Sequence, residues 1–273
     1  VLVSLQNPLL WVHPFGALTK NLPIVAGTAL ILHRSWQGQL GQAPPAPLLT
    51  AHWHNLLLLT YAVAPERLAS YLPPGVELDR RHGQAFVSLL SLDFEGLRLL
   101  GFPCPGWRRF PDVNLRIYVR RAEQRGVVFV REIVPSRLLA WMARRVSGEP
   151  FLAARLESTQ QEYADRVVVE RRLHVGGRVH TMRGEGSKPA FLPEAESAEH
   201  FLKERYWGFG TDRCGRPRRF RVEHPAWEVY PVQSYSLELD WEQVYGPDWA
   251  FLRHATPDSI VFAVGSAVAV YSR

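Results

Sequence analysis

Residues 112–120 read DVNLRIYVR, and this stretch decides the fold that the sequence predicts. Its residues alternate with a period of two, which is typical of a β-strand. One face carries Asp112, Asn114, Arg116, Tyr118 and Arg120, and the other carries Val113, Leu115, Ile117 and Val119. If the polar face lines an enclosed cavity, a carboxylate, an amide, a guanidinium and a phenol converge there; if it faces water, the segment is an ordinary half-exposed strand.

Many strands and few helices flank this segment. Gly176 and Gly177 form a two-residue turn that predicts a hairpin. The predicted strands are 54–63, 84–94, 127–133, 166–175, 178–183, 219–223, 227–239 and 260–271, and the predicted helices are 135–146 and 197–206. This pattern favours an α+β fold, mainly antiparallel β, in which one sheet closes into a barrel with a few flanking helices.

A linker divides the chain. Residues 38–47 read GQLGQAPPAP, a composition typical of a connection between ordered parts. We therefore predict residues 1–47 as an N-terminal extension that ends in this linker, and residues 48–273 as one barrel domain. The apolar stretch 22–32 is too short to cross a membrane and lacks the features of a secretory signal. No membrane partner is predicted.

The formal net charge is +6, from 32 Lys and Arg against 26 Asp and Glu. The basic residues are scattered among acidic ones, which argues against nucleic acid as a partner. The densest group is the loop from Arg213 to Arg219, with the sequence RCGRPRR. This loop is either a solvated surface or a patch that binds anions.

The cysteines and histidines predict neither a disulfide framework nor a metal site. The chain has only two cysteines, Cys104 and Cys214, which are too few for a disulfide framework and do not have the close spacing of a zinc site. They favour a reducing, cytoplasmic compartment. His52 and His54 share one face of a strand, but no clear third ligand accompanies them, so surface or core histidines are the simpler interpretation. Motifs for phosphate or dinucleotide binding are absent from the sequence, and no cofactor is predicted.

Arginine and aromatic residues are the candidates for ligand binding. Arg116 suits an anionic or carbonyl ligand, because its planar fork matches carboxylate and carbonyl oxygens. His224 and Trp227, in the segment HPAW, combine aromatic surface with hydrogen-bonding groups. Such residues are typical of a pocket for a small ligand, and equally of a core with satisfied polar tips.

From about Thr50 to Arg273 the chain resembles the YqjF-like family of unknown function, DUF2071. The landmarks are LPPG at 72–75 with Asp79, FPDVNLRIYV at 110–119, RGV at 125–127, AR at 143–144, FLKERY at 201–206 and HPAW at 224–227. Their order across the domain makes the resemblance specific. The family is similar in turn to acetoacetate decarboxylase, which implies a closed, mostly antiparallel β-barrel with flanking helices and an internal cavity.

The decarboxylase forms a Schiff base between a lysine and a keto acid. The segment ARRVSGEP at 143–150 resembles the one that leads into the adjacent lysine pair of that enzyme, but Phe151 and Leu152 follow it here. The resemblance places His54 at a substrate-gripping arginine, Ser88 at one site glutamate and Asp112 at the other. It implies that Schiff-base decarboxylation is absent. The lysines Lys20, Lys188 and Lys203 lie before the domain, in a loop and on a helix, so none is expected to substitute.

Three hypotheses remain open. The favoured one is a cytosolic, small-molecule-binding barrel in which Arg116 grips an organic acid or carbonyl compound; the other predicted lining residues are Ser88, Asn114, Tyr118, Phe151, His224 and Trp227. The second is a non-covalent lyase- or isomerase-type enzyme on the same cavity, with Asp112 or His54 as general base and Arg116 stabilising an enolate or carboxylate. The third is a protein that binds anions or nucleic acid through the loop 213–219. The sequence leaves the ligand and the oligomeric state, including a homo-oligomer, open.

Overall fold

The computed structural model describes residues 46–146, 150–212 and 214–272. The chain divides into two units, residues 1–46 and residues 47–273, and the second unit is the one described below. The predicted N-terminal extension therefore lies almost wholly outside the described residues. Within the described ranges, no helix combines the length and the apolar character that crossing a membrane requires.

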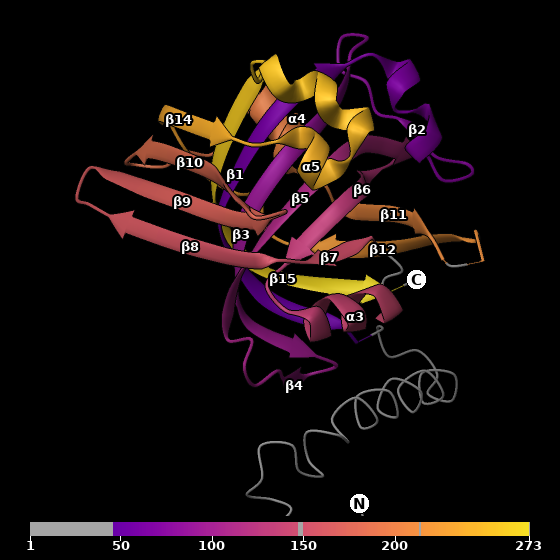
Figure 1. The fold of residues 1–273 in the computed structure, drawn as a ribbon, viewed down its shortest axis with the longest axis horizontal. Helices are drawn as coiled ribbons and strands as arrows, with labels where there is room; N and C mark the ends of the chain where they lie inside the picture. The colour runs from indigo at the N-terminus through magenta and orange to yellow at the C-terminus, as the bar shows by residue number, and fades with distance from the viewer. Residues whose placement is uncertain (1–45, 147–149, 213, 273) are drawn as a thin grey trace, which may run out of the picture. The chain divides into compact units, whose positions relative to one another are not determined.

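Strands dominate the second unit (Figure 1). They are β1 (Leu49–Val63), β2 (Glu77–Leu78), β3 (Ala85–Leu99), β4 (Phe102–Pro103), β5 (Arg109–Arg121), β6 (Gln124–Val134), β7 (Phe151–Ala153), β8 (Arg155–Glu162), β9 (Arg166–Val175), β10 (Arg178–Ser187), β11 (Trp207–Thr211), β12 (Pro217–Glu223), β13 (Val229–Tyr230), β14 (Val232–Glu238) and β15 (Ser259–Ser272). The helices are α3 (Arg137–Val146), α4 (Ala198–Lys203) and α5 (Trp241–Tyr245), with 3₁₀ turns η2 (Pro65–Arg67), η3 (Ala69–Tyr71) and η4 (Pro247–His254).

Seven strands pair in a ring. The order β5-β3-β1-β15-β12-β11-β6 returns to its start because β6 also pairs with β5. The pairing of β6 with β11 is parallel, and the other pairings around the ring are antiparallel. The predicted α+β class with mainly antiparallel strands is confirmed.

A second, four-stranded sheet has the order β14-β10-β9-β8 and crosses the ring as a separate layer (Figure 1). The predicted hairpin is confirmed as β9–β10, with Gly176 and Gly177 at φ 58° and 77°. The prediction of one continuous strand over 227–239 is wrong. Pro231 separates β13, which pairs with β15, from β14, which pairs with β10, because proline has no N–H to donate to a continuing ladder.

Strand β5 is buried on both faces, from Phe110 to Val119. Val113, Leu115 and Ile117 belong to a core cluster shared with residues of the second sheet, such as Val169. The opposite face of β5 points into the ring, where the side chains of Asp112, Asn114 and Arg116 are only 2%, 3% and 6% exposed. The interpretation of this segment as an ordinary half-exposed strand is therefore wrong.

A bulge in β1 decides which of its side chains enter the ring. Asn55 has φ 53°, and the register between β1 and β3 shifts between His54 and Leu57. An extra residue of this kind turns the side chains on either side of it to opposite faces. The opposite strand accommodates the bulge at Gly265, where φ is 93° and a Cβ would lie 2.0 Å from the carbonyl oxygen of Trp53. Trp53 consequently faces the interior.

Candidate functional site

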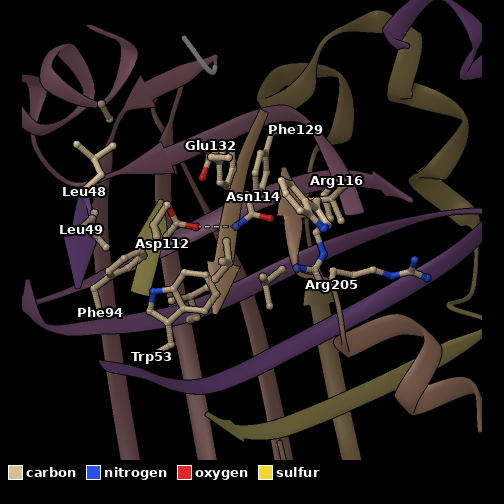
Figure 2. Close-up of a pocket in the computed structure, with 18 of the residues that line it drawn as sticks. Leu48, Leu49, Trp53, Phe94, Asp112, Asn114, Arg116, Phe129, Glu132 and Arg205 are labelled. Carbon is tan, nitrogen blue, oxygen red and sulfur yellow. Dashed lines mark hydrogen bonds between the residues drawn. The ribbon is translucent and has the colours of Figure 1, made fainter. Parts of the chain in front are cut away.

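A cavity of about 190 Å³ lies among the strands of the ring. Every ring strand contributes to its lining, through Trp53 of β1, Leu90 of β3, Asp112 of β5, Phe129 of β6, Trp207 of β11, Phe220 of β12 and Val270 of β15. Most of the lining is aromatic or aliphatic. In Figure 2, Asp112, Asn114 and Glu132 lie on one side of this pocket, while Arg116 and Arg205 lie on the other. The cavity therefore has an acidic side and a cationic side within mostly apolar walls.

Asp112 and Asn114 form the acidic side together with Glu132. Asn114 Nδ2 donates a hydrogen bond of 2.7 Å to Asp112 Oδ1. Asn114 also lies directly opposite Glu132 on β6. Burial raises the pKa of Asp112 to about 7, although the hydrogen bond from Asn114 opposes this rise. Near neutral pH this carboxyl can therefore either accept or donate a proton.

Arg116 is a buried guanidinium on the cationic side. Its Nη2 donates to the carbonyl oxygen of Leu202 at 3.3 Å, and its Nε has no hydrogen-bond partner. No carboxylate of the described residues lies within ion-pair distance of it. A buried, uncompensated charge is costly, so this guanidinium favours an anion in the cavity.

Arg205 follows helix α4 and reaches the same side of the cavity. Its Nη1 is bonded to the carboxylate of Asp79, which also accepts from Arg125 Nε at 2.8 Å. Its guanidinium carbon lies 4.2 Å and 4.9 Å from the ring centres of Phe201 and Tyr118. Burial lowers the pKa of Arg205 to about 10, a drop that the hydrogen bond to Asp79 limits. Arg205 Nε and Nη2 have no partner and remain available as donors.

Eight Asp, Glu, Lys and Arg residues are buried in the described part of the chain, and six of them form three ion pairs. The pairs are Arg171 with Asp93, Arg205 with Asp79, and Lys203 with Glu204. The remaining two are Asp112 and Arg116. Both lie on β5, and both line the cavity.

Lys203, which is not expected to substitute for the Schiff-base lysine, lines the cavity and is completely buried. Phe201, Leu202 and Lys203 are all buried at the end of α4, and the chain leaves the helix at Glu204. The helix therefore has no exposed face there for a lysine to occupy. Sequence analysis also missed Arg205, which the landmark FLKERY contains.

Glu204 holds Lys203 in place. Its carboxylate accepts from Lys203 Nζ, from Tyr206 Oη at 2.7 Å and from the backbone N–H of Trp227 at 3.1 Å. Burial would raise the pKa of Glu204, but these hydrogen bonds outweigh it and hold the pKa below its ordinary value. Glu204 is thus a carboxylate at neutral pH, and it compensates the charge of the Lys203 ammonium.

Five of the predicted site residues, namely Asp112, Asn114, Arg116, Phe151 and Trp227, line the cavity. Ser88 and Tyr118 do not. They lie farther along the inward faces of β3 and β5, where Ser88 Oγ bonds to the hydroxyls of Tyr118 and Thr60, each at 2.6 Å. The Tyr118 ring instead packs against the guanidinium of Arg205, which does line the cavity.

His54 and His224 lie in a second surface depression, not in the cavity lining. The bulge at Asn55 turns His54 away from the ring interior, where its Nε2 lies 3.1 Å from Glu95. The prediction that His54 shares a cavity with Arg116 is therefore wrong. The His224 ring stacks between Tyr206 and Trp227, with ring centres 4.8 Å and 3.9 Å away, and burial lowers its pKa.

The arginine-rich loop divides between the surface and the cavity. Arg218 and Arg219, on β12, contribute to the cavity lining. Arg219 Nη1 donates to Gln124 Oε1 at 3.0 Å. The exposed turn is closed by Asp212 Oδ1, which accepts from the backbone N–H of Arg216 at 2.9 Å. Arg213 lies outside the described residues.

Comparison with known proteins identifies relatives by sequence. Residues 50–267 match the model of the family DUF2071, described as an uncharacterized conserved protein, COG2071. The chain is 31% identical over 162 residues to the uncharacterized protein YqjF of Bacillus subtilis (strain 168). That alignment covers 59% of this chain and 66% of YqjF, just under two thirds of its length.

Solved structures with a similar fold belong to acetoacetate decarboxylase and related enzymes. The acetoacetate decarboxylase of Legionella pneumophila matches with a TM-score of 0.57 and 14% identity, over 86% of this chain and 92% of that one. An acetoacetate decarboxylase-like enzyme from Sphingomonas wittichii RW1 matches with a TM-score of 0.55 and 13% identity, over 85% and 94%. The enduracididine biosynthesis enzyme MppR, complexed with pyruvate, matches with a TM-score of 0.54 and 17% identity, over 86% and 91%. At these identities the likeness concerns the fold alone.

Proposed function

This chain belongs to the DUF2071 family, and we propose that its ring of seven strands is a closed β-barrel that binds a small organic acid or carbonyl compound without covalent chemistry. The observation that supports this best is Arg116, a buried guanidinium that lines the cavity and has no carboxylate partner among the described residues. The proposed partner is a small molecule in the cytoplasm, not nucleic acid or a membrane. The free thiols of Cys104 and Cys214 suit such a reducing compartment.

The geometry around Arg116 supports a carboxylate as the group that is bound. A carboxylate accepts two parallel hydrogen bonds from a guanidinium and supplies the charge that Arg116 lacks. Arg205 Nε and Nη2 are further donors without a partner. The apolar part of the ligand would pack against the aromatic walls, to which Phe129 and Phe151 contribute. A pocket with mostly apolar walls and a few polar groups that orient the ligand is typical of small-molecule sites.

Two features support a non-covalent site. Phe151 lines the cavity, and its ring cannot form an imine. Lys203 also lines the cavity, but its Nζ is held in an ion pair by the buried Glu204 carboxylate, whereas imine formation needs an amine that is free to attack a carbonyl. We therefore expect no covalent adduct when the protein is treated with acetoacetate and borohydride and its mass is measured. An adduct would contradict the proposal, and its loss in Lys203→Met would identify the amine.

Thermal unfolding in the presence of short-chain carboxylates tests the binding itself. A ligand at a hundredfold excess over its Kd stabilises the folded state by about 2.7 kcal/mol. For a domain of this size, that corresponds to a rise in Tm of about 5–10 °C. The rise should vanish in Arg116→Met and persist in the matched control Arg120→Met, which removes an exposed arginine from the same strand. Equal shifts in both variants would contradict the role of Arg116.

Asp112 supports a second candidate function, a non-covalent enzyme that moves a proton. With its pKa raised to about 7, this carboxyl is suited to general acid–base catalysis. As a carboxylate it would remove a proton from the carbon beside the carbonyl of a bound oxo acid, and Arg116 would stabilise the resulting enolate. NMR in D₂O would then show exchange of that proton, at a rate that rises with pH through about 7. No exchange with wild-type protein, or equal exchange with Asp112→Asn, would reject this candidate.

A further inference from the structure

Asn114 lies between Asp112 and Arg116, the two buried charged residues that form no ion pair within the described part of the chain. Asp112, Asn114 and Arg116 follow one another on the inward face of β5, and neighbouring residues on one face of a strand are about 7 Å apart at Cα. Any ligand that extends along β5 from Arg116 toward Asp112 therefore passes Asn114. What Asn114 can offer to such a ligand depends on how its amide is oriented.

Asp112 fixes that orientation. Asn114 Nδ2 donates to Asp112 Oδ1 at 2.7 Å, so the amide oxygen must point elsewhere. Figure 2 shows this oxygen directed away from Asp112, toward the side of the pocket where Arg116 lies. Asn114 Oδ1 is buried and accepts no hydrogen bond from any described residue. A buried acceptor without a donor is costly, so the pocket favours a ligand that brings one.

The unpartnered hydrogen-bond donors and the unpartnered acceptor of the pocket require different groups on the ligand. Arg116 Nε, Arg205 Nε and Arg205 Nη2 need an acceptor, which a carboxylate provides. Asn114 Oδ1 needs a donor, which neither a carboxylate nor a carbonyl group provides. A hydroxyl or an amino group does provide one. A plain fatty acid or an oxo acid would leave this acceptor unsatisfied.

We propose that the ligand is a carboxylic acid that also carries a hydroxyl or amino group, with its carboxylate on Arg116 and Arg205 and its donor on Asn114 Oδ1. This inference rests on the proposed function, since it assumes that the cavity binds an organic acid, and it narrows the class of acid. A site built around a buried acceptor discriminates strongly against analogues that lack the matching donor.

Isothermal titration calorimetry with derivatives of hexanoate tests the proposal. The panel contains hexanoate, its α-hydroxy, ω-hydroxy, α-amino and ω-amino derivatives, and its α-oxo derivative. We expect at least one hydroxy or amino derivative to bind roughly tenfold or more tightly than hexanoate, because it satisfies Asn114 Oδ1. The α-oxo derivative should bind no more tightly than hexanoate. Comparing hydroxy with amino derivatives shows which donor the site prefers.

The variant Asn114→Leu removes the acceptor and keeps a side chain of similar size. In this variant the advantage of the hydroxy or amino derivative over hexanoate should disappear. If the variant fails to fold, the wild-type panel still decides. Hexanoate and its oxo derivative binding as tightly as every hydroxy and amino derivative would overturn this inference and leave the proposed function intact. Binding of neutral hexanamide as tightly as hexanoate, or binding of none of these acids, would instead contradict the proposed function.

Discussion

We expect the substitution Asp112→Asn to stabilise the protein above neutral pH and to change its stability little in acid. Burial raises the pKa of Asp112 from 3.8 to about 7. In acid the carboxyl is protonated in both the folded and the unfolded chain. As the pH rises from about 4 to about 7, the unfolded chain loses this proton first, so the free energy of unfolding of the wild type falls. Above about pH 7 the folded state contains a buried charge that the asparagine variant lacks.

The size of this effect follows from the two pKa values. Their difference, about 3.2, corresponds to about 4 kcal/mol, because one pKa unit is worth about 1.36 kcal/mol at 25 °C. Asparagine has nearly the same shape as aspartate, and its side-chain oxygen can still accept the hydrogen bond from Asn114. The substitution therefore removes the buried charge and keeps the local contact.

Urea denaturation followed by tryptophan fluorescence, repeated from about pH 4 to about pH 8.5, measures the effect. The difference in free energy of unfolding between Asp112→Asn and wild type should grow with pH by about 4 kcal/mol. The exposed Asp165 provides a control, since Asp165→Asn removes a carboxyl that is already in water. A difference that changes by less than about 1 kcal/mol over this range would refute the view of Asp112 as a buried carboxyl without a cationic partner.

Three substitutions test other parts of the structure. Asp79→Asn leaves the buried Arg205 without its carboxylate partner and should lower the free energy of unfolding, measured by urea denaturation, by about 3–5 kcal/mol. A decrease of less than about 1 kcal/mol would contradict the buried ion pair. Asn55→Ala places alanine at φ 53° and should cost about 1 kcal/mol, and an unchanged urea midpoint would contradict the bulge. Gly184→Ala puts a Cβ 2.7 Å from Leu57 Cδ2 and should lower the free energy of unfolding by about 1–3 kcal/mol. An unchanged Tm in thermal unfolding would contradict the close packing of the two sheets at this position.

The inward face of β5 could be predicted because the required information is local. A strand alternates its side chains strictly, so the period of two in residues 112–120 was enough to place Asp112, Asn114 and Arg116 on one face. Their burial could not be derived from this pattern, since the same alternation suits a strand in water. What decides the matter is the complete ring, which depends on pairings between distant parts of the chain, such as β1 with β15 and β6 with β11.

The rest of the site depends on features that leave little trace in sequence. Asn55 reverses the alternation of β1, and its only signal is that asparagine tolerates positive φ. That reversal brings Trp53 to the cavity and takes His54 away from it. Lys203 and Arg205 belong to the cavity because α4 ends where it does, and helix ends are not fixed by periodicity. The sequence does contain one signal for these cavity residues, namely the charged run Lys-Glu-Arg directly after two apolar residues.

Of the strands in the second sheet, β9, β10 and β14 overlap predicted strands, and β8 does not. Strand β8 has the sequence RLESTQQE, in which Leu156 is the single large apolar residue. As an edge strand it is mostly exposed, so its residues carry no alternating pattern to detect. Its pairing with β9 is a tertiary property of the fold, and propensity alone could not reveal it.

The spacing of residues on β5 explains why Asp112 and Arg116, alone among the buried charged residues of the described chain, form no ion pair. Asp112 and Arg116 are four residues apart on a strand, about 13 Å between their Cα atoms, and the paired neighbours β3 and β6 hold that strand extended. A direct ion pair between them would satisfy both charges and remove the reason for Arg116 to bind an anion. Because Asp112 and Arg116 stay apart, an anion bound at Arg116 interacts electrostatically with the Asp112 carboxyl. Ionisation of Asp112 repels the ligand's carboxylate, and by reciprocity a bound carboxylate favours the protonated form of Asp112. The affinity for organic acids should therefore fall as the pH rises through about 7, the value at which Asp112 loses its proton.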